Sequence, residues 1–239
     1  LGTGGGIRRA AEFLRVSETC LVMAGDMLID VDLPGLAARH RASGRGVSLV
    51  LRRDSREASF GSVGVDDAGR ICRIGRHPLR PEPVERDRGL FTSIRFFERD
   101  ALVDWPDREV FEDLRDWLMP RAAAGELELG GELVDPSGSV WEPVGTPAEY
   151  LEANLMPPAL PSLGGDVRAW TGDVAIAGAR GDVVAARSVA IPSDASLARC
   201  VVWDDARVPS GMRARDGVFG ARGFHPAGVA DDADQRGAA

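Results

Sequence analysis

The chain has 239 residues, of which 44% are hydrophobic, and a formal net charge of -8 at pH 7. This length and apolar content allow a full hydrophobic core, so we expect one large domain and a smaller piece. The arginines are interspersed with acids, which argues against nucleic-acid binding because a phosphate backbone requires clustered cations. No apolar stretch nears the roughly 20 residues that span a bilayer, and no signal peptide opens the chain, so we expect a cytoplasmic protein without a membrane partner.

The cysteines and basic residues exclude several kinds of chemistry. Cys20, Cys72 and Cys200 are odd in number and widely spaced, which indicates neither a disulfide framework nor a zinc site. We interpret them as small core residues. The chain contains no lysine, so every lysine-dependent mechanism is excluded.

The chain opens with a glycine cluster, Gly2 to Gly6, and apolar residues at helical spacing follow from Ile7 to Leu14. This pattern predicts a loop that leads into a helix. Backbone N–H groups at such a helix start can hold the anionic or polar edge of a nucleotide. The alternative is a flexible chain end. A dinucleotide-binding fingerprint is disfavoured because no strand precedes the cluster.

An apolar run that begins at Cys20 ends at Gly25-Asp26, and Asp30 and Asp32 follow within six residues. We predict a parallel strand with acids at its carboxyl end. Ligands bind at that edge of open α/β sheets, and closely spaced carboxylates suit a Mg²⁺ ion that also holds substrate phosphates. Asp26 is therefore the first candidate for chemistry, and a turn or helix cap is its alternative role.

Strands and helices alternate through the following hundred residues. Asp32 is placed to cap one helix, and Thr146 and Glu149 are spaced as a capping box for another. His40 falls at a helix end, where a positive charge suits the helix dipole. The predicted helices are 34–41, 110–124 and 147–155, and the predicted strands are 47–51, 61–66, 70–74, 90–97 and 140–141. Such alternation indicates a mostly parallel α/β sheet.

The composition changes after residue 155. Residues 156–165 are rich in Pro and Gly and are predicted to be a linker. Val183, Val189 and Ala195 then recur every six residues, which is the period of a left-handed β-helix. Because the run holds fewer than about three coils, we predict a short hexapeptide-repeat-like β extension over residues 166–225, through which a homo-oligomer could form. Residues 226–239 are predicted to be a disordered tail.

Several motifs follow one another in an order that resembles the sugar-1-phosphate nucleotidyltransferases. These enzymes make nucleoside diphosphate sugars, and they include the mannose-1-phosphate guanylyltransferase type. The matching segments are Leu1-Gly2-Thr3-Gly4-Gly5-Gly6, Ala24-Gly25-Asp26, Phe60-Gly61-Ser62-Val63, Asp66-Asp67-Ala68-Gly69-Arg70-Ile71, Trp141-Glu142-Pro143-Val144-Gly145-Thr146-Pro147 and Tyr150-Leu151-Glu152-Ala153-Asn154. The resemblance covers residues 1–155 and implies a Rossmann-like nucleotide-diphospho-sugar transferase domain. The resemblance is specific because all of these motifs occur in the same order as in the family.

The resemblance also implies a reaction and a set of site residues. A nucleotidyl group would pass from a nucleoside triphosphate to a sugar 1-phosphate, and pyrophosphate would leave. Mg²⁺ is the implied cofactor, with Asp26 as its ligand. The nucleotide would contact Gly2, Thr3, Gly4 and Gly5, and the sugar phosphate would approach closely at Gly61. The motifs do not encode which sugar or which base is used.

The chain also departs from the family pattern. The Gly-x-Gly-Thr-Arg loop and the Pro-Lys-Pro segment, which supply the family's key cations, have no counterpart, so no catalytic residue is assigned. We therefore expect the domain to be N-terminally incomplete and to belong to a longer protein. Arg76-His77 stands at a Glu-Lys pair, and Pro143 stands at a second metal-ligating Asp.

These departures motivate a second hypothesis, which is a non-catalytic nucleotide-sugar-binding regulatory or sensor protein on the same scaffold. A third hypothesis treats the six-residue pattern as an acyltransferase module. That class needs many coils and a well-placed His, which this chain does not offer.

Overall fold

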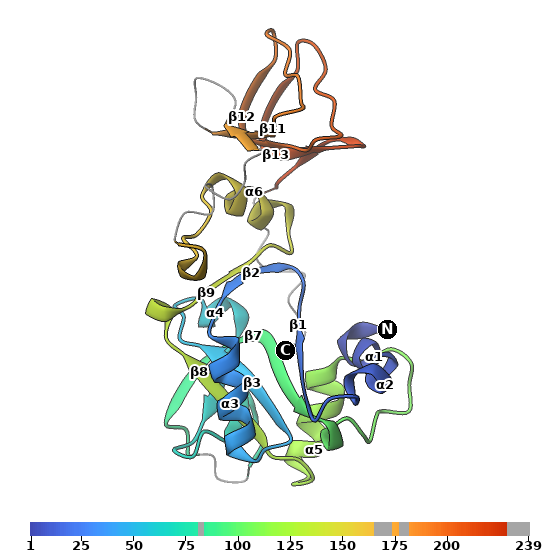
Figure 1. Ribbon diagram of the computed structural model, residues 1–239, viewed down its shortest axis with the longest axis vertical. Helices are drawn as coiled ribbons and strands as arrows, with labels where there is room; N and C mark the ends of the chain where they lie inside the picture. The colour runs from blue at the N-terminus through green and yellow to red at the C-terminus, as the bar shows by residue number, and fades with distance from the viewer. Residues whose placement is uncertain (81–83, 165–173, 177–181, 229–239) are drawn as a thin grey trace. The chain divides into compact units, whose positions relative to one another are not determined.

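The computed structural model describes residues 1–80, 84–164, 174–176 and 182–228 (Figure 1). The described residues form two compact units. Among the described residues, the first comprises Leu1–Gly25 and Val31–Ser139, and the second comprises Asp26–Asp30 and the described residues between Val140 and Gly228. Parts of the predicted β extension, at 166–173 and 177–181, and the predicted tail from 229 onward lie outside the described residues.

Within the described residues, the first unit has a seven-stranded sheet in the order β6-β5-β4-β7-β3-β8, with β1 also paired to β7. The strands are β1 (Thr19–Met23), β3 (Val47–Arg52), β4 (Val63–Val65), β5 (Ile71–Ile74), β6 (His77–Pro78), β7 (Asp87–Glu98) and β8 (Leu129–Val134). The strand predicted at Cys20 and the five strands predicted between residues 47 and 141 are all present, the last of them as β9 (Val140–Pro143), and β4 and β5 form the predicted hairpin. The mixed α/β class is therefore confirmed.

The prediction of a mostly parallel sheet is wrong. Strands β3 and β8 pair in parallel, whereas β7 runs antiparallel to β1, β3 and β4. The predicted parallel strand at Cys20 is accordingly β1, antiparallel to β7. The reason is that β7 lies between β1 and β3, which point in the same direction, and that tight turns join β4, β5 and β6, a connection that only antiparallel strands allow.

The helices of the first unit are α1 (Gly2–Arg9), α2 (Ala11–Leu14), α3 (Leu33–Ser43), α4 (Glu57–Phe60) and α5 (Met119–Ala123). Helix α3 confirms the predicted cap, because the Asp32 side chain accepts a hydrogen bond from Gly35 N at 2.9 Å. The helix predicted over 110–124 begins later, at Asp113, and its first six residues are π-helical. Its start is delayed because Glu112 is extended.

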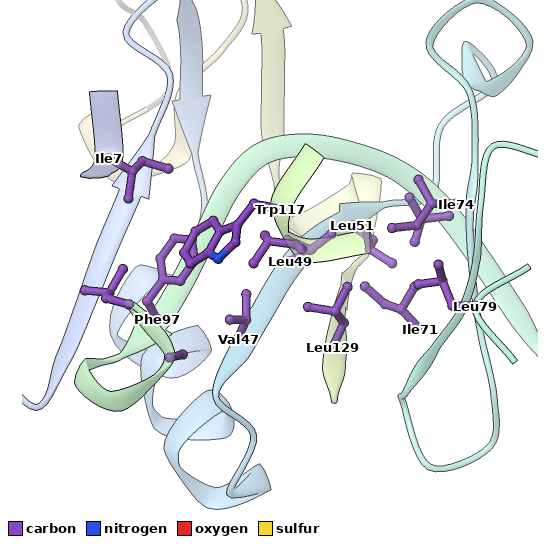
Figure 2. Close-up of a cluster of buried hydrophobic side chains, with 14 of the residues drawn as sticks. Ile7, Val47, Leu49, Leu51, Ile71, Ile74, Leu79, Phe97, Trp117 and Leu129 are labelled. Carbon is purple, nitrogen blue, oxygen red and sulfur yellow. The ribbon is translucent and has the colours of Figure 1, made fainter. Parts of the chain in front are cut away.

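Figure 2 shows the hydrophobic core of the first unit. Val47, Leu49 and Leu51 point from β3 into a cluster in which each is fully buried. Trp117, from the π-helical turn, stacks on Phe97 of β7 with ring centroids 5.7 Å apart. Burial of one such aliphatic or aromatic side chain contributes roughly 1.5–3 kcal/mol, so this cluster is the main source of stability in the unit.

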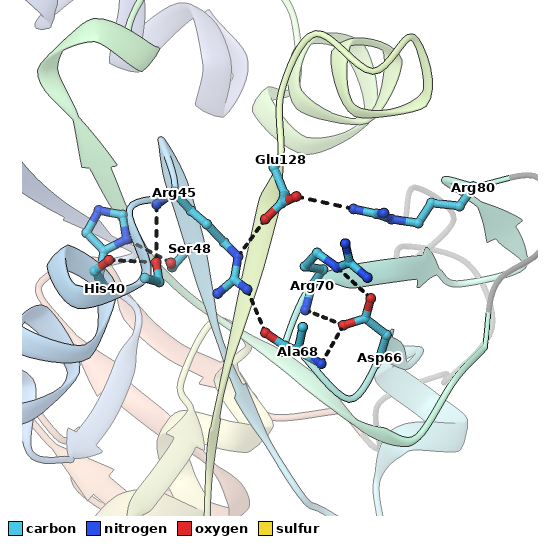
Figure 3. Close-up of polar contacts among 9 residues, drawn as sticks. His40, Arg45, Ser48, Asp66, Ala68, Arg70, Arg80 and Glu128 are labelled. Atoms are coloured by element: carbon cyan, nitrogen blue, oxygen red, sulfur yellow. Dashed lines mark hydrogen bonds and ion pairs between the residues drawn. The ribbon is translucent and has the colours of Figure 1, made fainter.

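Polar contacts brace the edge of the same sheet (Figure 3). Arg45, which follows α3, pairs through Nε with Glu128 at 3.0 Å and donates through Nη2 to the carbonyl of Ala68 at 2.6 Å. Within the β4–β5 turn, Arg70 Nε donates to Asp66 at 2.7 Å. The arginine thus ties the end of α3 to the hairpin turn and to the start of β8.

His40 lies in the last turn of α3, as predicted, but it is fully buried. Its Nδ1 is 2.7 Å from Ser48 Oγ, and its Nε2 is 3.2 Å from Glu98 Oε1. Burial lowers the pKa of His40, and the carboxylate of Glu98 offsets part of that effect. The lowered pKa opposes the positive charge expected at this helix end, because desolvation outweighs the attraction of Glu98.

We expect acid to destabilise the fold through His40. The folded-state pKa lies below the unfolded value of 6.5, so as pH falls below 6.5 the unfolded chain takes up a proton that the folded chain does not. Stability is lost through that window by up to about 1.4 kcal/mol per pH unit. Chemical denaturation at about pH 7.5 and about pH 5.5 should show a smaller loss for His40→Gln than for the unaltered chain. The exposed His77, changed to Gln, is the matched control, and an equal loss in all three proteins would contradict the prediction.

The second unit contains a small two-stranded sheet and a larger sheet, as far as the structure describes the chain. β2 (Met27–Asp30) pairs antiparallel with β9 (Val140–Pro143). Helix α6 (Pro147–Leu155) follows, and it has the predicted capping box, in which Thr146 and Glu149 bond reciprocally. The larger sheet has the order β10 (Val174–Ile176), β11 (Val183–Ala186), β12 (Ser196–Val202), β13 (Arg213–Gly220) and β14 (Gly223–Pro226).

Strands β11, β12 and β13 pair in parallel and repeat regularly. Val183 lies beside Cys200 and Cys200 beside Gly217, so successive strands repeat after 17 residues. The residues that recur every six positions share one apolar cluster with their counterparts in the next repeat, namely Val183, Val189, Ala195, Cys200, Ala206 and Met212. On the other face, Leu151 of α6 packs with Val201 and Val218, so α6 belongs with this unit.

The predictions for the C-terminal tail and for the cysteines can be compared with the structure. Pro226 belongs to β14 and Ala227 N donates to Asp216 O at 2.8 Å, so the predicted disordered tail has an ordered beginning. Cys200 and Cys72 are buried, Cys20 is partly buried, and all three are free, as expected for core cysteines. Burial raises the pKa of each of the three thiols.

No helix within the described ranges has both the length and the apolar character needed to cross a membrane.

Candidate nucleotide and metal site residues

The predicted site residues fall into both units. Gly2, Thr3, Gly4, Gly5 and Gly61 belong to the first unit, and Asp26 belongs to the second.

The glycine cluster forms helix α1, so the predicted loop is wrong. Its amides already have partners: Gly4 N and Gly5 N donate to the carbonyl of Phe111 at 3.0 and 3.3 Å, and Phe111 N donates back to the carbonyl of Leu1 at 3.1 Å. The N–H groups that the sequence suggested for a ligand are thus used to dock the start of α1.

Close packing explains why a helix forms from such weak helix formers. A Cβ atom at Gly4 would overlap the ring of Phe111, and one at Gly5 would lie 2.5 Å from the carbonyl oxygen of Glu109. Gly2 has a φ of +66°, a conformation that L side chains rarely adopt. Only glycines let the helix approach residues 109–111 this closely, and the tertiary contacts override their low helix propensity.

Thr3 is exposed, but its hydroxyl group contacts two carboxylates. Its Oγ1 lies 2.6 Å from Glu112 Oε2 and 2.6 Å from Asp113 Oδ1. Asp113 in turn forms an ion pair with Arg95 at 2.5 Å. Thr3 and Arg95 both line an open cavity of about 470 Å³ beside α1 and β1.

Ser93 also lines this cavity and has an unusual backbone conformation. It is a non-glycine residue in the middle of β7 with a φ of 61°, a conformation that costs about 1 kcal/mol or more. Its carbonyl accepts hydrogen bonds from Ala24 N at 3.2 Å and from Arg95 Nη1 at 3.3 Å. The strained turn thereby fixes the residue that follows β1.

Gly61 lies between α4 and β4 with φ 79° and ψ 164°, a region open essentially to glycine alone. Nothing lies within 4 Å of the position that its Cβ would take. This open backbone is compatible with close approach of a ligand, and the assignment of that ligand stays a prediction.

The Asp26 side chain is exposed, and no residue in the described part of the chain forms a hydrogen bond or ion pair with it. Its carbonyl accepts a hydrogen bond from Val144 N at 2.8 Å, which anchors the backbone. A Cβ at Gly145 would lie 3.1 Å from Asp26 Oδ2, so the glycine keeps the space beside the carboxylate open. Pro143 pairs with Met27 on the neighbouring strand.

The two other acids of the first cluster have separate roles. Asp30 belongs to β2, and its carboxylate accepts a hydrogen bond from Ser162 N at 2.8 Å. Asp32 caps α3, as expected. Across the described residues no group of three or more His, Cys, Asp or Glu side chains is arranged to hold a metal ion. A metal at Asp26 would therefore need ligands from substrate or water.

The family model described as nucleotidyl transferase matches residues 1–157 of the chain. The chain belongs to the nucleotidyl transferase family. The family predicted from the order of the motifs is thus confirmed, and the match covers every predicted site residue.

Three relatives illustrate the range of the family. Mannose-1-phosphate guanylyltransferase of Mycobacterium tuberculosis is 28% identical over 220 residues, which are 88% of this chain and 59% of that protein. Glucose-1-phosphate adenylyltransferase 1 of Alkalilimnicola ehrlichii is 31% identical over 148 residues, 56% of this chain and 35% of that protein. UTP–glucose-1-phosphate uridylyltransferase of a Synechocystis species is 28% identical over 156 residues, 64% of this chain and 39% of that protein.

This member of the nucleotidyl transferase family thus spans between 35% and 59% of the length of the relatives that it matches. The names of the three relatives specify transfer of guanylyl, adenylyl and uridylyl groups. Likeness at this level therefore leaves the base undetermined.

Sequence reasoning missed Arg95, Asp113 and Ser93. Arg95 and Asp113 stand 18 positions apart on different elements, and no spacing rule connects them. A non-glycine residue with positive φ also leaves no mark in the sequence. These residues emerge only when β7 and the π-helical turn are brought together.

Two glycines of α1 should respond oppositely to substitution. Gly4→Ala forces a methyl group against the buried Phe111 ring and should lower the unfolding free energy by about 1–3 kcal/mol. Gly6→Ala places its methyl where nothing lies within 4 Å and should raise it by about 0.5–1 kcal/mol. Urea denaturation of both variants measures the difference, and a destabilised Gly6→Ala protein would show that α1 is not the helix described here.

Proposed function

We propose that the protein transfers a nucleotidyl group from a nucleoside triphosphate to a sugar 1-phosphate and releases pyrophosphate. The observation that carries the proposal is the exposed Asp26 carboxylate, anchored through its own backbone and left open by Gly145. Asp26 and Gly145 both belong to motifs whose order resembles that of sugar-1-phosphate nucleotidyltransferases. Membership of the nucleotidyl transferase family supports the reaction class.

The chemistry needs alignment and charge neutralisation. An oxygen of the sugar phosphate attacks the α-phosphorus of the triphosphate while the bond from that phosphorus to the departing pyrophosphate breaks. Charge accumulates on the phosphoryl oxygens, so positioning and electrostatic stabilisation supply most of the rate. In this proposal the α1 segment with Thr3 holds the nucleotide, and Gly61 lets the sugar phosphate come close to the backbone.

The residues at Asp26 fit a magnesium ion. Mg²⁺ is usually bound through one or two carboxylates, with water and substrate phosphates filling the other positions. The Asp26 carboxylate is exposed and has no partner in the described residues, while Pro143 offers no side-chain oxygen. When bound, the ion would neutralise charge on the reacting phosphates. Asp26 would hold it as the carboxylate ligand.

Substitution of Asp26, with Asp30 as the control position, gives a direct test. Asp26→Asn should reduce Mg²⁺-dependent pyrophosphate release by about 100-fold, on the scale of losing one electrostatic stabiliser. Asp30→Asn should retain turnover, because the Asp30 carboxylate accepts a structural hydrogen bond from Ser162 N. The assay uses the protein as its gene encodes it, with each of the common nucleoside triphosphates and several sugar 1-phosphates.

Equal turnover of the two variants would contradict the role of Asp26. If the unaltered protein releases no pyrophosphate but binds a nucleotide sugar in calorimetry, the transferase proposal fails and the regulatory or sensor hypothesis takes its place.

For the second unit we propose a short left-handed β-helix-like coil. The 17-residue repeat of the parallel strands and the shared cluster of the six-residue pattern support it. Homo-oligomer formation through this unit and a cytoplasmic location stay predictions.

A further inference from the structure

We infer that Arg95 is a positioning residue for nucleotide binding. Arg95 holds the side chain of Asp113 in place, and Asp113 in turn fixes Thr3 and the start of α1. The inference rests on the proposed function, because it assigns a purpose to the contacts beneath the predicted nucleotide segment. It adds two residues, Arg95 and Asp113, that the motifs do not include.

The ion pair is buried and held on several sides. The side chains of Arg95 and Asp113 are 7% and 3% exposed, and Nε of the arginine is 2.5 Å from Oδ2 of the aspartate. The guanidinium lies over the ring of Phe91, 5.0 Å from its centroid, and Nη1 donates to the carbonyl of Ser93. A buried charge with this many contacts has little freedom to move, so its partner carboxylate is fixed as well.

Asp113 connects the buried arginine to the exposed residue Thr3. Its Oδ2 faces Arg95, and its Oδ1 lies 2.6 Å from Thr3 Oγ1, the same distance as Glu112 Oε2. The backbone N–H of Asp113 also points to Thr3 Oγ1 at 3.2 Å. The hydroxyl of an exposed residue is thus oriented by a carboxylate that the buried arginine holds in place.

The position of this chain of contacts indicates a binding role. An ion pair that only stabilised the core would end in the core, whereas this one ends at Thr3. Thr3 and Arg95 both line the cavity of about 470 Å³ beside α1 and a second cavity of about 170 Å³ beside the π-helical turn. Glycine gives α1 little intrinsic order, so the segment depends on outside contacts to keep one conformation before a ligand arrives.

The test compares two buried, arginine-bound aspartates in the same unit. Asp113→Asn breaks the proposed connection. Asp54→Asn is the matched control, because Asp54 is 5% exposed and accepts from Arg56 at 2.8 and 2.9 Å, away from α1. Both changes remove a buried carboxylate charge, so a loss of stability alone should affect the two variants alike.

The first measurement is hydrogen exchange at the amides of Gly4 and Gly5 without ligand. We expect exchange to accelerate by about tenfold or more in Asp113→Asn and to stay within about twofold of the unaltered protein in Asp54→Asn. Should Asp113→Asn fail to fold, Thr3→Val replaces it, because that change removes the hydroxyl that contacts Asp113 and leaves both members of the buried ion pair in place. Unchanged exchange in the folded variant would overturn the inference.

The second measurement is calorimetry with ATP, GTP and UTP in the presence of Mg²⁺, using whichever the unaltered protein binds most tightly. Affinity should fall about tenfold in Asp113→Asn, since the ligand must then order roughly one further residue of backbone, and should be kept in Asp54→Asn. Equal affinities in the two variants overturn the inference and leave the proposed function standing. An unaltered protein that binds none of the three triphosphates refutes the proposed nucleotide site itself, and the inference with it.

Discussion

Backbone pairing along strand β7 is the constraint on which the first unit depends. Its twelve residues, Asp87–Glu98, pair with β4 near the start and lie between β1 and β3 near the end. Phe97 on this strand faces the core beneath Trp117, and Glu98 faces His40. A single strand therefore positions the hydrophobic core, the buried histidine and the end of β1.

The same strand links packing to the candidate chemistry. Ser93 takes a left-handed backbone conformation, and its carbonyl holds both Ala24 and Arg95. Arg95 reaches Asp113, which the start of α1 contacts through Thr3. Strain and a buried charge pair are both unfavourable when isolated, and they persist here because many neighbouring contacts fix them. Such arrangements are concentrated at sites that must be ordered before a ligand binds.

The second unit is built from repeated parallel strands that pack against helix α6. Parallel strands repeated after 17 residues place equivalent side chains in columns, one set in an inner cluster and another against α6. The capping box at Thr146 starts α6, and Arg199 then joins Glu152 on that helix to Asp216 on β13. The carboxylate of Asp26 is part of this unit through the β2–β9 pair, so the metal candidate is anchored to the same structure as the family's closing motif.

The sequence by itself determined the family, five of the seven strands described in the sheet of the first unit, and the capped helices. Asp32 with Gly35 and Thr146 with Glu149 act across three residues, so local spacing contains all the information that their hydrogen bonds require. The order of the motifs was likewise visible without a structure. Asp26 was singled out for the same reason.

Only the tertiary structure decided that the glycine cluster is a helix, that β7 runs antiparallel between β1 and β3, and that His40 is buried with a lowered pKa. It also decided the pairing of Arg95 with Asp113. Each of these outcomes depends on residues far apart in the chain: the close approach of Phe111 to Gly4, the insertion of one strand between two others, and burial of His40 beneath its neighbours. Desolvation and packing act on what lies nearby in space, and a sequence pattern records only what lies nearby along the chain.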